Sequence, residues 1–196
     1  MAEAETTEEW WQRDPLGFCI AKIKDPDDQI RLDSAMHLGL IGPDEPEGLK
    51  ALAGALHDSD HWVRVEAAWS LWKCSRGIDV VETELVRALS NSDDEVRWVS
   101  ALTLSANVDS GQRSLGAILA ALNAETDPVA RVRLADAVLR IDGANHAAAD
   151  HLRAAVSSNT AKANGAVAEI LETSEHLPRT LVVELQELLE NNYEPK

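Results

Sequence analysis

Apolar side chains recur at spacings of three and four residues along most of this chain, which is the pattern of helices that bury one face. The pattern also repeats on a larger scale. A valine or isoleucine precedes an arginine, an alanine follows the arginine by four residues and a leucine by seven, and this motif returns after 33 residues. The arginines are Arg31, Arg64 and Arg97, and a fourth copy at Arg133 requires a three-residue insertion. Such a self-similar period predicts an array of stacked helical units.

The residues before each arginine carry signals for the start of a helix. An Asp or Asn lies six residues upstream of each one, where its side-chain oxygen could accept the free amide hydrogens of a first helical turn. These expected N-caps are Asp25, Asp58, Asn91 and Asp127. A proline follows the first and the last of them, as is common at the first position of a helix.

A second helix is expected after each of these, because turns rich in Gly, Pro or Asp separate it from the first. The expected second helices cover residues 46–56, 80–89, 112–122 and 146–156. Further helices over residues 14–23 and 179–191 would close the two ends, and residues 160–171 form a degenerate copy in which Lys162 replaces the arginine. Trp10 and Trp11 are expected to hold the first closing helix in place.

The expected fold is therefore an all-α solenoid of about five helical hairpins. We assign residues 8–191 to one domain and residues 1–7 to a disordered acidic tail. The expected units cover residues 25–57, 58–90, 91–123, 127–156 and 160–191.

Charge narrows the classes of partner. The chain has 34 acidic and 18 basic residues and a net charge of −16, which disfavours nucleic acid and anionic lipid surfaces and favours a basic protein. A generally acidic proteome, as in high-salt organisms, would explain the same balance. No apolar run approaches the roughly 20 residues that span a bilayer, and the N-terminus lacks a signal-peptide pattern, so we expect a soluble cytoplasmic protein. Its two cysteines lack metal or redox spacing and are expected to be reduced thiols.

The Asp-x5-Arg spacing, the preceding valine and the trailing alanine and leucine resemble HEAT repeats, especially the short type of the phycobilisome-lyase proteins. The resemblance implies a right-handed stack in which the Val-Arg helices line the concave side. It also implies a structural ladder between units that is built from the caps and the arginines: Asp25, Asp58, Asn91 and Asp127 with Arg31, Arg64, Arg97 and Arg133. Because Asn91 has no charge, its rung is expected to be at most a neutral hydrogen bond.

Positions two before and two, six and nine after each arginine point away from the apolar stripe at about 100° per residue. The resemblance to HEAT repeats implies that they lie on the concave face. They differ between units, as recognition positions on a repeated frame would. The predicted binding residues are Asp33, His37, Trp62, Glu66, Ser70, Lys73, Glu95, Val99 and Thr103. Trp62 stands where other units have polar residues and is the expected apolar anchor; packing against a neighbouring unit is the alternative. Trp69 and Trp98 are expected in the core and Trp72 beside the groove.

These features favour a non-enzymatic protein-interaction module, an adaptor, assembly factor or inhibitor that holds a basic and apolar protein segment. No catalytic residue, metal site or cofactor is expected, and the oligomeric state is expected to be a monomer or weak dimer. The alternative is a small-molecule or chromophore-binding enzyme or chaperone of the phycobilin-lyase type. It would use a groove lined by Trp62, Trp69, Trp72 and Trp98.

Overall fold

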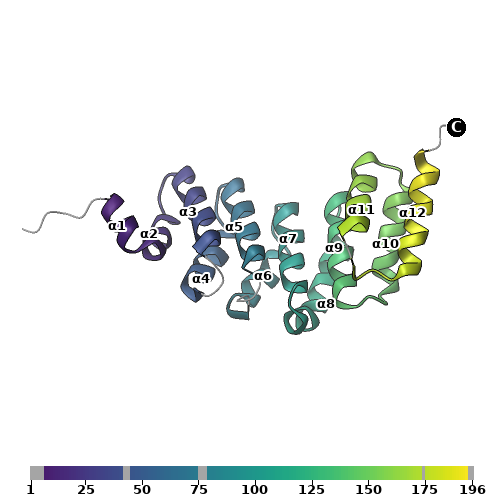
Figure 1. Ribbon diagram of the computed structural model, residues 1–196, viewed down its shortest axis with the longest axis horizontal. Helices are drawn as coiled ribbons and strands as arrows, with labels where there is room; N and C mark the ends of the chain where they lie inside the picture. Colours follow the sequence, from purple (N-terminus) through teal and green to yellow (C-terminus); the bar gives the residue numbers. More distant parts are fainter. Residues whose placement is uncertain (1–6, 42–44, 75–78, 174, 194–196) are drawn as a thin grey trace, which may run out of the picture.

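A computed structural model describes residues 7–41, 45–74, 79–173 and 175–193, and every regular element in these ranges is a helix (Figure 1). The helices are α1 (Thr7–Arg13), α2 (Pro15–Lys22), α3 (Asp28–Ile41), α4 (Pro46–Ala55), α5 (His61–Lys73), α6 (Glu82–Ala88), α7 (Asp94–Ser105), α8 (Val108–Ala124), α9 (Pro128–Ile141), α10 (His146–Ser157), α11 (Ala161–Thr173) and α12 (Arg179–Tyr193). Of the predicted acidic tail, Thr7 opens α1, and residues 1–6 lie outside the described residues.

The helices form two layers along an elongated stack, which confirms the predicted all-α solenoid (Figure 1). We call α3, α5, α7, α9 and α11 the inner layer, and α2, α4, α6, α8, α10 and α12 the outer layer. Helices α3, α5, α7 and α9 pack against one another more extensively than α4, α6 and α8 do. The stack bends with α8 on the outer side of the bend (Figure 1). Closer packing in one layer is what bends such a stack toward that layer.

The repeated small and apolar residues form the seams of the inner layer, as their spacing predicts. The alanines four residues after an arginine and the leucines seven after it are at most 2% exposed in the first three units: Ala35, Ala68, Ala101, Leu38, Leu71 and Leu104. Helices α3 and α5 approach so closely that a Cβ atom on Gly39 would lie 2.3 Å from Ser70 Oγ. Glycine at this position therefore lets the two backbones meet.

The helix starts differ from the prediction by two residues. Asp60 caps α5 and Asp93 lies at the cap position of α7, while Asp58 and Asn91 lie in the turns before them. Each of these two earlier side chains accepts the amide hydrogen two residues on, at 2.8 Å for Asp58 and 3.0 Å for Asn91. They stabilise an Asx turn and not a helix end. Asp127 was predicted correctly, because its carboxylate accepts the amides of the first turn of α9.

The fourth and fifth units also follow a different register from the predicted one. The amide of one residue in each unit donates to the carbonyl four residues earlier, at the start of the helix: Arg31 to Asp27, Arg64 to Asp60, Arg97 to Asp93, Arg131 to Asp127 and Asn164 to Thr160. The fourth arginine is thus Arg131 and not Arg133, so the insertion is one residue. In the fifth unit Asn164, and not Lys162, takes the place of the arginine.

The two ends are closed much as expected. The rings of Trp10 and Trp11 pack edge to face against Phe18 of α2, at centroid distances of 5.2 and 5.6 Å. At the other end, Leu181 and Leu185 of α12 are buried against the last hairpin. Helix α1 was not predicted. None of the described helices is both long and apolar enough to cross a membrane.

Candidate functional site

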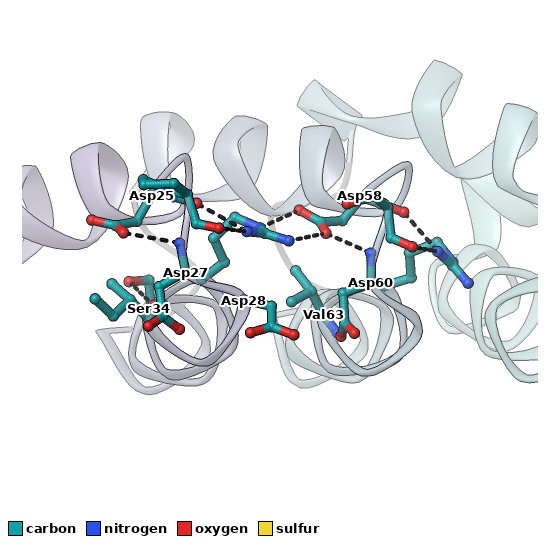
Figure 2. Close-up of polar contacts among 12 residues, drawn as sticks. Asp25, Asp27, Asp28, Ser34, Asp58, Asp60 and Val63 are labelled. Carbon is teal, nitrogen blue, oxygen red and sulfur yellow. Dashed lines mark hydrogen bonds and ion pairs between the residues drawn. The ribbon is translucent and has the colours of Figure 1, made fainter.

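The predicted ladder of arginines and carboxylates runs along the turns that join one unit to the next. Asp25 and Asp58 occupy the same place in two successive turns (Figure 2). Arg31 donates through Nε and Nη2 to the two carboxylate oxygens of Asp58, both at 2.8 Å, and through Nη1 to the carbonyl of Asp25 at 2.9 Å. One guanidinium therefore joins its own turn to the turn of the next unit by a bidentate pair.

This pairing changes the acidity of the carboxylate. Burial by itself would raise the pKa of Asp58, but the hydrogen bonds from Arg31 and from the amide of Asp60 outweigh it and lower the pKa below its usual value. Asp58 is therefore ionised at neutral pH, and the rung is charged.

The second rung differs from the prediction. Arg64 bypasses Asn91 and pairs with Asp93, which also receives His61 Nδ1 at 3.1 Å. The amide nitrogen of Asn91 donates instead to the carbonyl of Leu56 at 2.8 Å. The expected neutral rung is thus wrong, because a carboxylate two residues further along the turn lies within reach of the guanidinium.

The ladder ends after a third rung. Arg97 forms a bidentate pair with Glu125 at 2.8 Å for both bonds, and Arg131 donates to the carbonyl of the same Glu125. The fifth unit has Ser158 at the position that Asp25, Asp58 and Glu125 take in earlier units, so this position offers Arg131 no carboxylate. Arg133 was expected in the ladder but pairs with Glu169 of α11. The ladder joins successive units.

The predicted binding residues divide into exposed and buried ones. Trp62 is 64% exposed at the start of α5, where its ring packs edge to face against His61 at 4.9 Å. Asp33 and Lys73 are also exposed. Glu66 is partly buried, and its carboxylate accepts from Ser70 Oγ at 3.2 Å and lies 3.6 Å from Lys73 Nζ. These four expected residues reach the surface of the inner layer.

The expected exposed position is wrong for three other residues, because Ser70, Val99 and Thr103 are completely buried. Ser70 Oγ donates to the carbonyl of Ala35 in α3 at 3.1 Å, so this position faces the preceding helix. His37 is half-buried, with its ring 5.0 Å from that of Trp11. The predicted face was therefore rotated toward the seam between units.

The open face includes positions five and eight after the arginine, which were not predicted, together with position nine, which was. It carries large apolar side chains on α3 and α5: Met36 is 41% exposed, Leu40 71% and Trp72 39%. We call the exposed surface of α3, α5 and α7 the inner face. A helical-wheel sum over all four units would have located it, since the fifth position lies at about 140° from the arginine at 100° per residue.

Three indoles form a connected cluster on this face. The ring of Trp69 is 5.5 Å from that of Trp72 at 90° and 5.3 Å from that of Trp98 at 83°. Trp69 Nε1 donates to Glu95 Oε1 at 2.7 Å, which joins α5 to α7. The guanidinium carbon of Arg133 lies 5.5 Å from the centre of the Trp98 ring. Trp69 and Trp98, which were expected in the core, are half-buried: they pack against the core and also form a surface row with Trp72.

The described residues include no group of three His, Cys, Asp or Glu side chains that could hold a metal ion. Burial raises the pKa of Cys19 to about 11, so this thiol is protonated and a poor nucleophile at neutral pH. Hollows open between helices of the outer layer, such as the one between α2 and α4 that Ile20, Lys50 and Gly54 line.

No family model matches the sequence, and no curated protein does. Among solved structures, an engineered protein from a structural-genomics consortium is similar over 91% of this chain and 97% of its own, with 16% identity and a TM-score of 0.49. The complex of CpcE and CpcF of phycocyanin lyase from Nostoc sp. is similar over 98% of this chain and 97% of that one, with 15% identity and a TM-score of 0.44. The chain's own stacked helical hairpins show an all-α solenoid.

Proposed function

We propose that this protein is a non-enzymatic binding module that holds a basic and apolar protein segment on its inner face. The observation that carries the proposal is the row of large apolar side chains left open on adjacent helices. Leu40, Trp62 and Trp72 are each at least 39% exposed, and Met36 lies beside Leu40 on α3. Exposed apolar clusters with a polar border are typical of sites that a partner covers.

The border of this row supports a basic partner. Asp33, Glu66 and Glu95 stand on the same three helices as the apolar residues, and the chain as a whole carries a net charge of −16. A field of this sign draws a cationic segment toward the face and repels nucleic acid. The apolar side chains then supply the affinity, and tryptophan is among the residues that most often dominate it.

The cluster geometry favours a protein segment over a flat pigment. Trp69 meets both of its neighbours edge to face and donates its indole hydrogen to Glu95, so its ring is already engaged in packing within the protein. The cluster is thus packed on itself and offers its outer surface to a partner.

The proposal is tested by photo-crosslinking from two exposed apolar positions. A benzoylphenylalanine replaces Leu40 on the inner face or Val80 beside the outer layer, where the side chain is 49% exposed. The two proteins are crosslinked in lysate of the source organism at low and high salt. We expect a discrete crosslinked species from position 40 that is weaker at high salt.

The same species should weaken in the double variant Trp62→Ala, Leu40→Ser, and it should persist in Val80→Ala. Equal crosslinking from positions 40 and 80, or crosslinking from position 80 alone, would contradict an inner-face site.

A further inference from the structure

The inner face already contains one guanidinium that rests on an indole. Arg133 lies over the ring of Trp98 and pairs with Glu169 of the next inner helix. A cation over an aromatic face is attracted by the negative charge of the ring surface, and arginine does this more often than lysine. The molecule thus shows, with its own side chain, that this row of indoles accepts a guanidinium.

At the opposite end of the indole row, no guanidinium of the described residues lies over an indole ring as Arg133 does over Trp98. Trp72 is 39% exposed, and Trp69 beside it is half-buried. Two carboxylates belong to the same neighbourhood. Glu95 accepts the indole hydrogen of Trp69 at 2.7 Å, and Glu66 lies one helical turn before Trp69 on α5.

Lys73, a described cation at this end, is easily displaced. Lys73 follows Trp72, and its ammonium lies 3.6 Å from Glu66, with the lysine side chain 47% exposed. A single long contact between exposed groups contributes little free energy. A guanidinium from a partner could pair with Glu66 in place of Lys73 and rest its plane on the indole at the same time, whereas an ammonium lacks the flat surface for stacking.

We infer that the exposed end of the indole row, Trp72 with Trp69, Glu66 and Glu95, recognises an arginine side chain of the partner protein. This inference rests on the proposed function and specifies the residue that the partner must supply. Leu40 and Trp62 provide apolar affinity, while the indole row discriminates arginine from lysine. Specificity of this kind requires both the charge and the planar shape of the guanidinium.

Three synthetic peptides test the inference. They are acetylated octapeptides that alternate leucine with arginine, with lysine, or with citrulline, which has the planar shape of arginine without its charge. Binding to the full chain is measured by tryptophan fluorescence at about 0.15 M salt, near physiological ionic strength. We expect the arginine peptide to bind about fivefold or more tightly than the lysine peptide, and the citrulline peptide to bind most weakly.

Two tryptophan variants on the same helix provide the matched control. Trp72→Leu should remove the preference for arginine over lysine and leave charge-dependent binding in place. Trp62→Leu should weaken all three peptides by similar factors and keep the preference. Both side chains are exposed, so neither variant should change the circular dichroism spectrum or the thermal midpoint appreciably.

Equal binding of the arginine and lysine peptides would overturn the inference, as would an arginine preference that survives in Trp72→Leu. If the peptides bind without a preference for arginine over lysine, the inner face remains an apolar and acidic docking surface. The proposed function would then hold without the arginine specificity. Failure of all three peptides to bind would argue against both.

Discussion

At the scale of single residues, the arginine ladder shows how one repeated contact can be made in different ways. Arg31 and Arg97 each form two parallel bonds to the acid in the next turn, whereas Arg64 bypasses an asparagine and reaches an aspartate two residues further on. The backbone carbonyl of Asp58, in the turn before the same helix, holds the guanidinium of Arg64 in place. The arginine side chain is long enough to reach an acid at either of two positions in the next turn.

The rung between Arg31 and Asp58 should contribute measurably to stability. Asp58→Asn keeps the shape but removes the charge from a pair in which each side chain is only 12% exposed. We expect a loss of about 1–3 kcal/mol in the free energy of unfolding, since a charge-assisted bidentate pair is broken and Arg31 is left without its counter-ion. Urea unfolding followed by circular dichroism measures this value.

The control for this rung is Asp150→Asn. Asp150 pairs with Arg153 through a side chain that is 72% exposed, where an ion pair is worth about 0.5 kcal/mol or less. A loss for Asp58→Asn no greater than that for Asp150→Asn would show that the rung does not hold the units together.

At the scale of helices, the stack depends on how closely neighbouring inner helices approach. Small residues at the contact positions allow this, and the outer helices, which pack less extensively, leave hollows between them. A larger side chain should therefore be tolerated better in the outer layer than in the inner layer.

Two glycine substitutions should have opposite effects for this reason. In Gly39→Ala of α3, the new methyl group would lie 2.3 Å from Ser70 Oγ, so the seam with α5 must open. In Gly54→Ala of α4, nothing lies within 4 Å of the new methyl group. We expect Gly54→Ala to stabilise the protein by about 0.5–1 kcal/mol through helix propensity, and Gly39→Ala to destabilise it by about 1–3 kcal/mol through overpacking.

Thermal unfolding of the two glycine variants provides the comparison. A rise in the midpoint for both would mean that the seam between α3 and α5 can widen without cost.

At the scale of the whole molecule, the ladder connects the units into a chain of carboxylates that are ionised in the folded state. Arg31 lowers the pKa of Asp58, Arg64 that of Asp93 and Arg97 that of Glu125, in each case against the opposing effect of burial. Asp136 behaves alike: burial opposes ionisation, but His176 and Arg140 bring its pKa below the usual value. The same groups therefore determine how the molecule responds to acid.

The lowered carboxylate pKa values predict loss of stability in acid. A group with a folded pKa below its unfolded value of about 4 contributes stability that is fully present above pH 5 and decreases as the pH falls through the folded pKa. We expect the free energy of unfolding to fall below about pH 5 and to continue falling toward pH 3. Asp58→Asn should reduce the slope in this range, because one coupled carboxylate is removed.

Chemical unfolding at pH values from 7 to 3 tests this dependence. A stability that stays constant or rises between pH 5 and 3 would indicate that relief of the repulsion among 34 acidic residues outweighs the ladder.

The sequence by itself determined the repeat period, the helical class and the residues of the seams, because a helix must place its buried residues at intervals of three and four, and a stacked unit must repeat them. It also identified Trp62 as exposed and Arg31 and Arg97 as ladder residues. These features depend on local spacing alone.

Only the tertiary structure decided which acid meets Arg64, where the fourth unit begins and which face is open. Asn91 and Asp93 lie two residues apart, and Arg131 and Arg133 are separated likewise, so spacing along the chain does not distinguish them; the distance between units does. Ser70 and Thr103 have polar side chains typical of a surface, yet the close approach of the preceding helix buries them. Polar groups can be placed there because a backbone carbonyl satisfies each hydroxyl. Thr103 donates to Val99 of its own helix, whereas Ser70 donates to Ala35 of the preceding helix, a partner that exists only once the chain is folded.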